Sequence, residues 1–176
     1  LNGIKNFNFS RVPIYFISVS PSEKKEVNAW FSWTPKKSFI VVEIPEKFLD
    51  TGDLFHVGVL AHEFFHLIIR KSKEISLQIN SITQENELLL IRLSKGMPPR
   101  LFFEELLVSS FIPEGYIGEK NFNRRNYISK SKPKDLLSWR RFVAYSLRSK
   151  SKEYVESKRI IDREYLESII NVLQRN

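Results

Sequence analysis

Residues 59–69, Val-Leu-Ala-His-Glu-Phe-Phe-His-Leu-Ile-Ile, decide the fold, because the pattern His-Glu-x-x-His lies inside an apolar run there. Residues four apart lie one turn above each other on the same helix face, so His62 and His66 can direct two imidazoles at one ion. If that ion is zinc, each ring nitrogen lies about 2.0–2.1 Å from it. Glu63 stands beside the ion, where it can take a proton from a water at the metal. The pattern predicts a helical zinc site; the simpler alternative is a buried helix that happens to carry two histidines.

The composition describes a folded, basic chain without cysteine. Of the 176 residues, 42% are hydrophobic and 13% aromatic, which indicates a globule with a core rather than a disordered chain. The formal net charge of +8 suits nucleic acid, anionic lipid or acidic peptides, although a solvated basic surface is the commoner explanation. Without cysteine, any metal site must use His, Asp or Glu.

Neither a membrane span nor a secretory signal is visible in the sequence. No run approaches roughly 18 uncharged apolar residues, and a basic start followed by an apolar middle is missing. These features favour a soluble, cytoplasmic protein. Because the chain begins with Leu1 rather than Met, a trimmed signal or anchor stays open.

Three strand-like segments precede the motif. The segments 12–19, 28–33 and 39–44 are rich in β-branched and aromatic residues and are separated by proline-containing or charged stretches. Strands this close in sequence favour a meander that is packed on one side by a helix. We therefore expect an α+β fold with a small, mostly antiparallel sheet on the motif helix.

Apolar periodicity and breaker residues predict helices at about 53–73, 77–93, 101–112, 135–149 and 152–173. Polar residues at 50–53 are N-cap candidates for the first of these helices. The chain changes character after Asn121, where a basic linker leads into the two amphipathic C-terminal helices. We therefore expect a motif-bearing domain at 1–120 and a basic helical segment at 121–176, called the C-terminal segment, which packs on that domain or regulates it.

A catalytic zinc site takes three protein ligands and leaves a position for water. The chain has no cysteine and no histidine after His66, so the third ligand is expected to be a carboxylate. Glu104 and Glu105 are the best-placed pair, because acids within an apolar helix are costly unless they are paired or metal-bound. His56 lies about 120° around the helix from His62, so we interpret it as a partly exposed histidine.

With these residues the chain resembles the gluzincin metallopeptidases, in which a glutamate on a later helix is the third ligand. The resemblance favours Glu105 over Glu104 as the third metal ligand. Ser109 would then contact one of the ligands without touching the metal, at a position where these enzymes usually have an acidic residue. Asn28-Ala29-Trp30-Phe31 is similar to the edge strand of thermolysin-like enzymes and of the CAAX prenyl-protease/HtpX group. The match covers roughly residues 14–116. It implies a zincin-like fold with a glutamate helix, in a soluble, minimal gluzincin.

The resemblance implies a zinc-dependent metalloendopeptidase with one catalytic Zn²⁺. The implied metal ligands are His62, His66 and Glu105. Glu63 is then the general base, which receives a proton from water and passes it to the leaving amine. The backbone of Asn28 and Ala29 would hold a peptide or protein substrate as an added strand. For the oxyanion, Tyr116 is our candidate and Arg124 the alternative, although both are read more simply as surface residues.

The basic C-terminal segment has three interpretations: a solvated appendage, a contact for nucleic acid or an anionic surface, or a regulatory segment over the cleft. A truncation after about Asn121 that raises activity would indicate the regulatory segment. The main competitor to a peptidase is a metalloprotease-like regulatory or nucleic-acid-associated protein with slow or no turnover. Glu63 argues against that competitor, since zinc binding alone does not require it. A zinc-free helical binding module is the remaining alternative.

Overall fold

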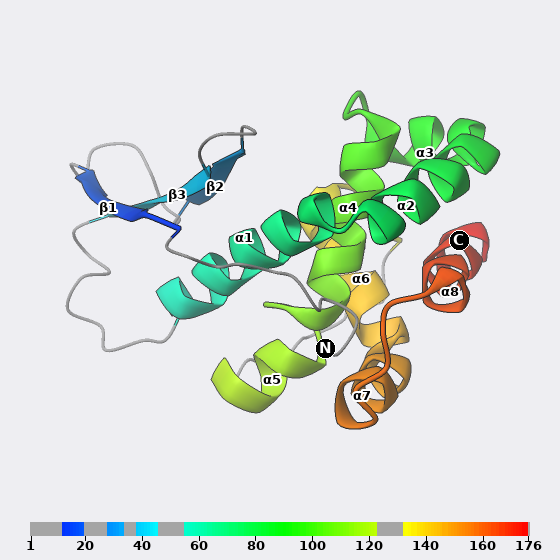
Figure 1. Cartoon of the computed structure of the whole chain (residues 1–176). Coiled ribbons are helices and arrows are strands. Elements are labelled where there is room, and N and C mark those ends of the chain that lie inside the picture. The colour runs from blue at the N-terminus through cyan, green and yellow to red at the C-terminus, as the bar shows by residue number, and fades with distance from the viewer. Residues whose placement is uncertain (1–11, 20–27, 34–37, 46–54, 123–131, 176) are drawn as a thin grey trace.

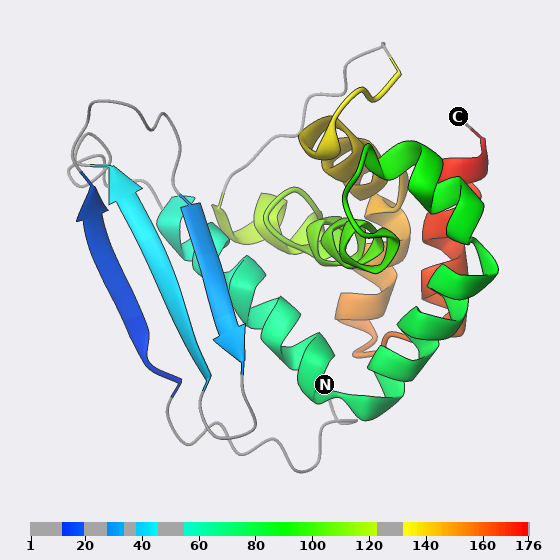
Figure 2. The same cartoon turned by 90° about the horizontal axis from the view of Figure 1, so that it is seen from above.

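The computed structural model describes residues 12–19, 28–33, 38–45, 55–122 and 132–175 (Figure 1). Within these ranges, strands come first along the chain and helices follow. The sheet lies on one side of helix α1 (Phe55–Lys71), and the other helices lie on its opposite side (Figure 2). The predicted α+β class is confirmed, with helices as the larger part.

Strands β1 (Ile14–Val19), β2 (Asn28–Trp33) and β3 (Ser38–Pro45) form a mixed sheet in the order β1-β3-β2. β1 runs parallel to β3, whereas β2 runs antiparallel to it. The predicted meander and the mostly antiparallel sheet are therefore wrong. The physical reason lies in residues 40–42, Ile-Val-Val, which are all buried. Because consecutive residues point to opposite faces, a strand that buries both faces belongs at the centre of a sheet.

One face of the sheet packs on α1. Ile40, Val42 and Ile44 of β3 form a small buried cluster against which Val59 and Phe64 of α1 pack. β2 is an edge strand, and among the described residues no further strand pairs with its outer side. The edge strand β2 therefore lies beside α1, the helix that carries the His-Glu-x-x-His motif.

The remaining helices are α2 (Lys73–Glu85), α3 (Glu87–Ser94), α4 (Pro99–Phe111), α5 (Tyr116–Phe122), α6 (Leu136–Ser146), α7 (Arg148–Glu156) and α8 (Arg163–Gln174). The helices predicted at 101–112 and 135–149 correspond to α4 and α6. The N-cap candidates at 50–53 and Arg124 lie outside the described residues.

Two predicted helices are each broken in two. The helix expected at 77–93 is interrupted at Asn86, whose φ of −119 and ψ of 23 are not helical and whose side-chain amide donates to the Ile82 carbonyl at 2.9 Å. The helix expected at 152–173 ends before Lys158, which has φ 56, a left-handed conformation that terminates helices. Asp162 then caps α8 by accepting a hydrogen bond from the Tyr165 amide at 3.0 Å.

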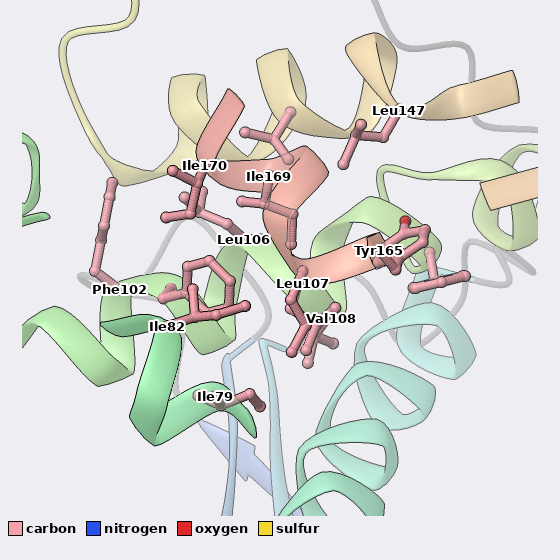
Figure 3. Close-up of a cluster of buried hydrophobic side chains, with 14 of the residues drawn as sticks. Ile79, Ile82, Phe102, Leu106, Leu107, Val108, Leu147, Tyr165, Ile169 and Ile170 are labelled. Carbon is pink, nitrogen blue, oxygen red and sulfur yellow. The ribbon is translucent and has the colours of Figure 1, made fainter. Parts of the chain in front are cut away.

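One hydrophobic core joins helices from both sides of the expected boundary at residues 120 and 121 (Figure 3). Its residues include Leu106 and Leu107 of α4 together with Ile169 of α8, which point toward one another. The Tyr165 hydroxyl adds polar bonds inside this core, 2.7 Å from both Ser110 Oγ and Ser151 Oγ. The C-terminal segment is therefore packed on α4. No helix in the described ranges has both the length and the apolar character that a membrane crossing requires.

Candidate metal centre

α1 and α4 bring the predicted ligands together. His62 and His66 lie one turn apart on α1 and are buried, and Glu105 lies on α4 with 18% of its side chain exposed. The His62 and His66 Nε2 atoms are 3.1 Å apart, and each lies within 3.3 Å of a Glu105 carboxylate oxygen. These three residues, which we call the ligand group, could hold a metal ion.

The other ring nitrogens face partners behind the group. His62 Nδ1 lies 3.0 Å from the Ile112 carbonyl oxygen, which can only accept, so Nδ1 carries the hydrogen. His66 Nδ1 lies 2.9 Å from Glu104 Oε1 and donates to that carboxylate. Such outer partners fix the tautomer and the ring orientation of metal-binding histidines. Both Nε2 atoms therefore face Glu105, and Glu104 is the outer partner rather than a member of the group.

Two imidazole nitrogens and a carboxylate thus converge on one point. Their lone pairs repel one another unless a proton or a metal ion lies among them. Imidazole nitrogen and carboxylate oxygen suit zinc and several other divalent metals, and three protein ligands leave a coordination position open. The residues present therefore fit a metal ion that is held by three protein ligands.

The electrostatics of the site favour a positive charge at His66 but not at His62. Burial lowers the pKa of His62. Burial acts in the same direction on His66, but its hydrogen bonds to Glu104 and Glu105 outweigh burial and raise its pKa to about 9. Burial would raise the pKa of Glu105, yet the hydrogen bonds from the two histidines hold that pKa well below its usual range. Glu105 is therefore a carboxylate at neutral pH.

Glu63, the predicted base, directly follows His62 on the same turn of α1. Burial raises its pKa to about 7, while the positive charge on His66 opposes this shift and the Glu105 carboxylate adds to it. The Glu63 carboxyl therefore lies within the electrostatic field of the ligand group. A carboxyl group with a pKa near the working pH is suited to both accept and return a proton.

A second layer of contacts ties strand β2 to the centre. The Phe31 ring stacks on His66 with ring centroids 5.8 Å apart, and the Arg70 guanidinium lies 4.8 Å from the Phe31 centroid. Arg70 Nε also donates to Glu104 Oε1 at 3.0 Å. The sequence analysis did not identify Arg70 as a site residue. Its spacing of four residues from His66, on the same helix face, was the signal that could have found it.

Arg140 of α6 is the second residue that the sequence analysis missed. Its Nη1 atom lies 3.7 Å from Glu105 Oε2, and its Nε donates to Ser109 Oγ at 2.6 Å. Ser109, which was expected to support the site, is fully buried there. Nothing in the sequence distinguishes Arg140 from the other cations of the C-terminal segment.

Of the other predicted residues, Asn28 and Ala29 lie on strand β2 and Tyr116 on helix α5. Asn28 and Ala29 belong to the open edge strand β2, as expected from the resemblance. The Tyr116 hydroxyl donates to Glu156 Oε1 at 2.7 Å, so a role beside the metal would require that bond to break. This hydrogen bond also raises the pKa of Tyr116. The expected exposure of His56 concerns a side chain outside the described part of the structure.

The two neighbouring glutamates give a direct test of the site. Glu105→Gln should weaken metal binding by more than the about 10–100-fold that loss of an outer partner costs. Glu104→Gln keeps an oxygen that can accept from His66 and should stay within that smaller range. Competition with a chelating dye measures both affinities. Wild-type affinity in Glu105→Gln together with a larger loss in Glu104→Gln would reverse the assignment.

Comparisons of the chain with protein-family models, with curated proteins and with solved structures gave no match. The functional reading therefore depends on the geometry of the centre and on its sequence motif.

Proposed function

We propose that this protein is a zinc-dependent metalloendopeptidase that hydrolyses peptide bonds with a glutamate-activated water. The observation that supports the proposal best is the convergence of His62, His66 and Glu105 beside Glu63. Two histidines and one glutamate are a ligand set used by catalytic zinc in peptidases. The same residues carry the resemblance to gluzincins.

The chain's own residues divide the chemistry among them. Zinc, when bound, supplies Lewis acidity that lowers the pKa of water and polarises a carbonyl. Glu63 accepts a proton as the water oxygen forms its bond to the scissile carbon, and it returns that proton to the amine nitrogen as the C–N bond breaks. The Ile112 carbonyl and Glu104 keep the two imidazoles turned toward the reacting atoms.

The substrate in this proposal is an extended peptide segment. β2 is an edge strand, so its outer backbone groups can pair with an added strand. The stacking of Phe31 on His66 holds that strand next to the ligand group. A peptide paired with the backbone of Asn28 and Ala29 would therefore run past Glu63.

Two arginines of the C-terminal segment are paired within the chain, which counts against their use in the nucleic-acid-associated alternative. Arg148 forms an ion pair with Glu119, and Arg163 forms ion pairs with Glu85 and Glu167. Guanidinium groups used in this way hold helices together and have less capacity for phosphate. Because paired charges cancel, the net charge of +8 comes from other cations of the chain.

Metal removal tests the proposed function. We expect the purified protein to hold one zinc ion per chain and to cleave casein or another unfolded protein. A chelator should abolish cleavage and lower the melting temperature, because a metal that binds only the folded state stabilises it, and added zinc should restore both. A preparation without stoichiometric zinc would overturn the proposal. Zinc binding without any hydrolysis would instead support the regulatory alternative.

A further inference from the structure

Arg140 of the C-terminal segment makes three contacts around the ligand group, one of them to Glu105 itself. Its Nε donates to Ser109 Oγ at 2.6 Å, and its Nη2 donates to Glu114 Oε2 at 3.2 Å. Its third nitrogen, Nη1, faces Glu105 Oε2 at 3.7 Å. Only 19% of the Arg140 side chain is exposed, so these contacts are partly shielded from water.

We infer that Arg140 is a positioning residue that holds the Glu105 carboxylate in the orientation required for metal binding. The inference rests on the proposed function, since it assigns an outer partner to one of the proposed ligands. Outer partners of metal ligands orient them and tune their affinity. The known outer partners here serve the histidines, and Arg140 serves the carboxylate.

The geometry of a guanidinium explains how this works. The group is planar and its nitrogens are held in a fixed fork, so two anchored nitrogens determine where the third one points. Ser109 lies one turn after Glu105 on α4, and Glu114 follows the end of that helix. With Nε and Nη2 anchored to these two residues, Nη1 is directed at Glu105 Oε2.

The charge balance points the same way. Glu105 Oε2 lies 3.3 Å from His62 Nε2 and 3.7 Å from Arg140 Nη1, and of these two neighbours the guanidinium carries the positive charge that attracts it. Without the guanidinium, that attraction is lost and the carboxylate is held less firmly. Arg140 also compensates the charge of Glu114, whose side chain is only 5% exposed. Removing Arg140 alone would leave that buried carboxylate unpaired and would disturb the fold as well as the site.

The test must therefore separate the metal site from the fold. In the double variant Arg140→Met/Glu114→Gln no unpaired buried charge remains, and we expect a folded protein with about 10–100-fold weaker zinc affinity. The absorption spectrum of the Co²⁺-substituted variant should also differ from that of the wild type, because the carboxylate ligand is differently placed. A matched control is Arg148→Met/Glu119→Gln, which removes another Arg–Glu pair between the C-terminal segment and the rest of the chain. The control should retain wild-type affinity and spectrum.

A conservative variant covers the case in which the double variant does not fold. Arg140→Lys keeps a positive charge near Glu114 but lacks the fixed fork, so we expect a smaller loss of zinc affinity and an altered Co²⁺ spectrum. Wild-type affinity and spectrum in either folded variant would show that Arg140 only joins helices, and would overturn the inference. A wild-type protein that binds neither zinc nor cobalt would overturn the proposed function, and this inference with it.

Discussion

Ending the chain after Asn121 is expected to unfold the protein and abolish metal binding, rather than to release activity. The truncation removes nine side chains of the hydrophobic core: Trp139, Val143, Leu147, Tyr154, Tyr165, Leu166, Ile169, Ile170 and Leu173. Fully burying one large apolar side chain stabilises a protein by about 1.5–3 kcal/mol. Together these contributions exceed the about 5–15 kcal/mol net stability of a typical domain. The truncation would also expose to water the apolar residues of α4 that pack on the C-terminal segment, and α4 is the helix that carries Glu105.

Far-UV circular dichroism with thermal melting measures this outcome, and casein cleavage gives the functional readout. A chain that ends after Gln174 is the matched control, because it keeps Leu173 and the whole of α8. The control should melt cooperatively and retain activity. A chain ending at Asn121 that folds and cleaves casein faster than the wild type would show instead that the C-terminal segment is inhibitory.

The variant Glu63→Gln is expected to keep stoichiometric zinc and to lose at least about a hundredfold, and up to about ten-thousandfold, in kcat/KM. The amide of glutamine has nearly the shape of the carboxylate, but it cannot accept the proton of the attacking water. Metal binding should persist because the ligand group is His62, His66 and Glu105, without Glu63.

Zinc content by atomic absorption and hydrolysis of a fluorogenic peptide measure the two halves of this prediction. Glu167→Gln, which makes the same chemical change at an exposed glutamate paired with Arg163, should leave both values unchanged. If Glu63→Gln retained hydrolysis within a factor of about ten, another group would be the base. If it lost zinc as well, Glu63 would be acting on the metal site itself.

In the mixed sheet, the burial of β3 on both faces determines the strand order, rather than the nearness of the strands along the chain. The three strands were located correctly from their composition, but their order was predicted from their nearness along the chain. The continuous apolar run at residues 40–42 was the better signal, since both faces of β3 are buried. Similarly, the breaks at Asn86 and Lys158 depend on single-residue conformations that apolar periodicity does not register.

The sequence alone determined the local part of the centre. His62, Glu63 and His66 lie within five residues of one helix, so helical geometry places them relative to one another whatever surrounds them. The absence of cysteine and of histidines after His66 favoured a carboxylate as the third metal ligand.

Only the tertiary structure decided which carboxylate belongs to the group. Glu104 and Glu105 are adjacent, and neighbouring side chains on a helix point about 100° apart. The packing of α4 against α1 therefore brings Glu105 to the Nε2 atoms of the two histidines and Glu104 to Nδ1 of His66. Tertiary packing likewise brought Phe31 and Arg140 to the centre from segments far away in the chain. Such contacts depend on how elements pack over long separations, which a local sequence pattern does not encode.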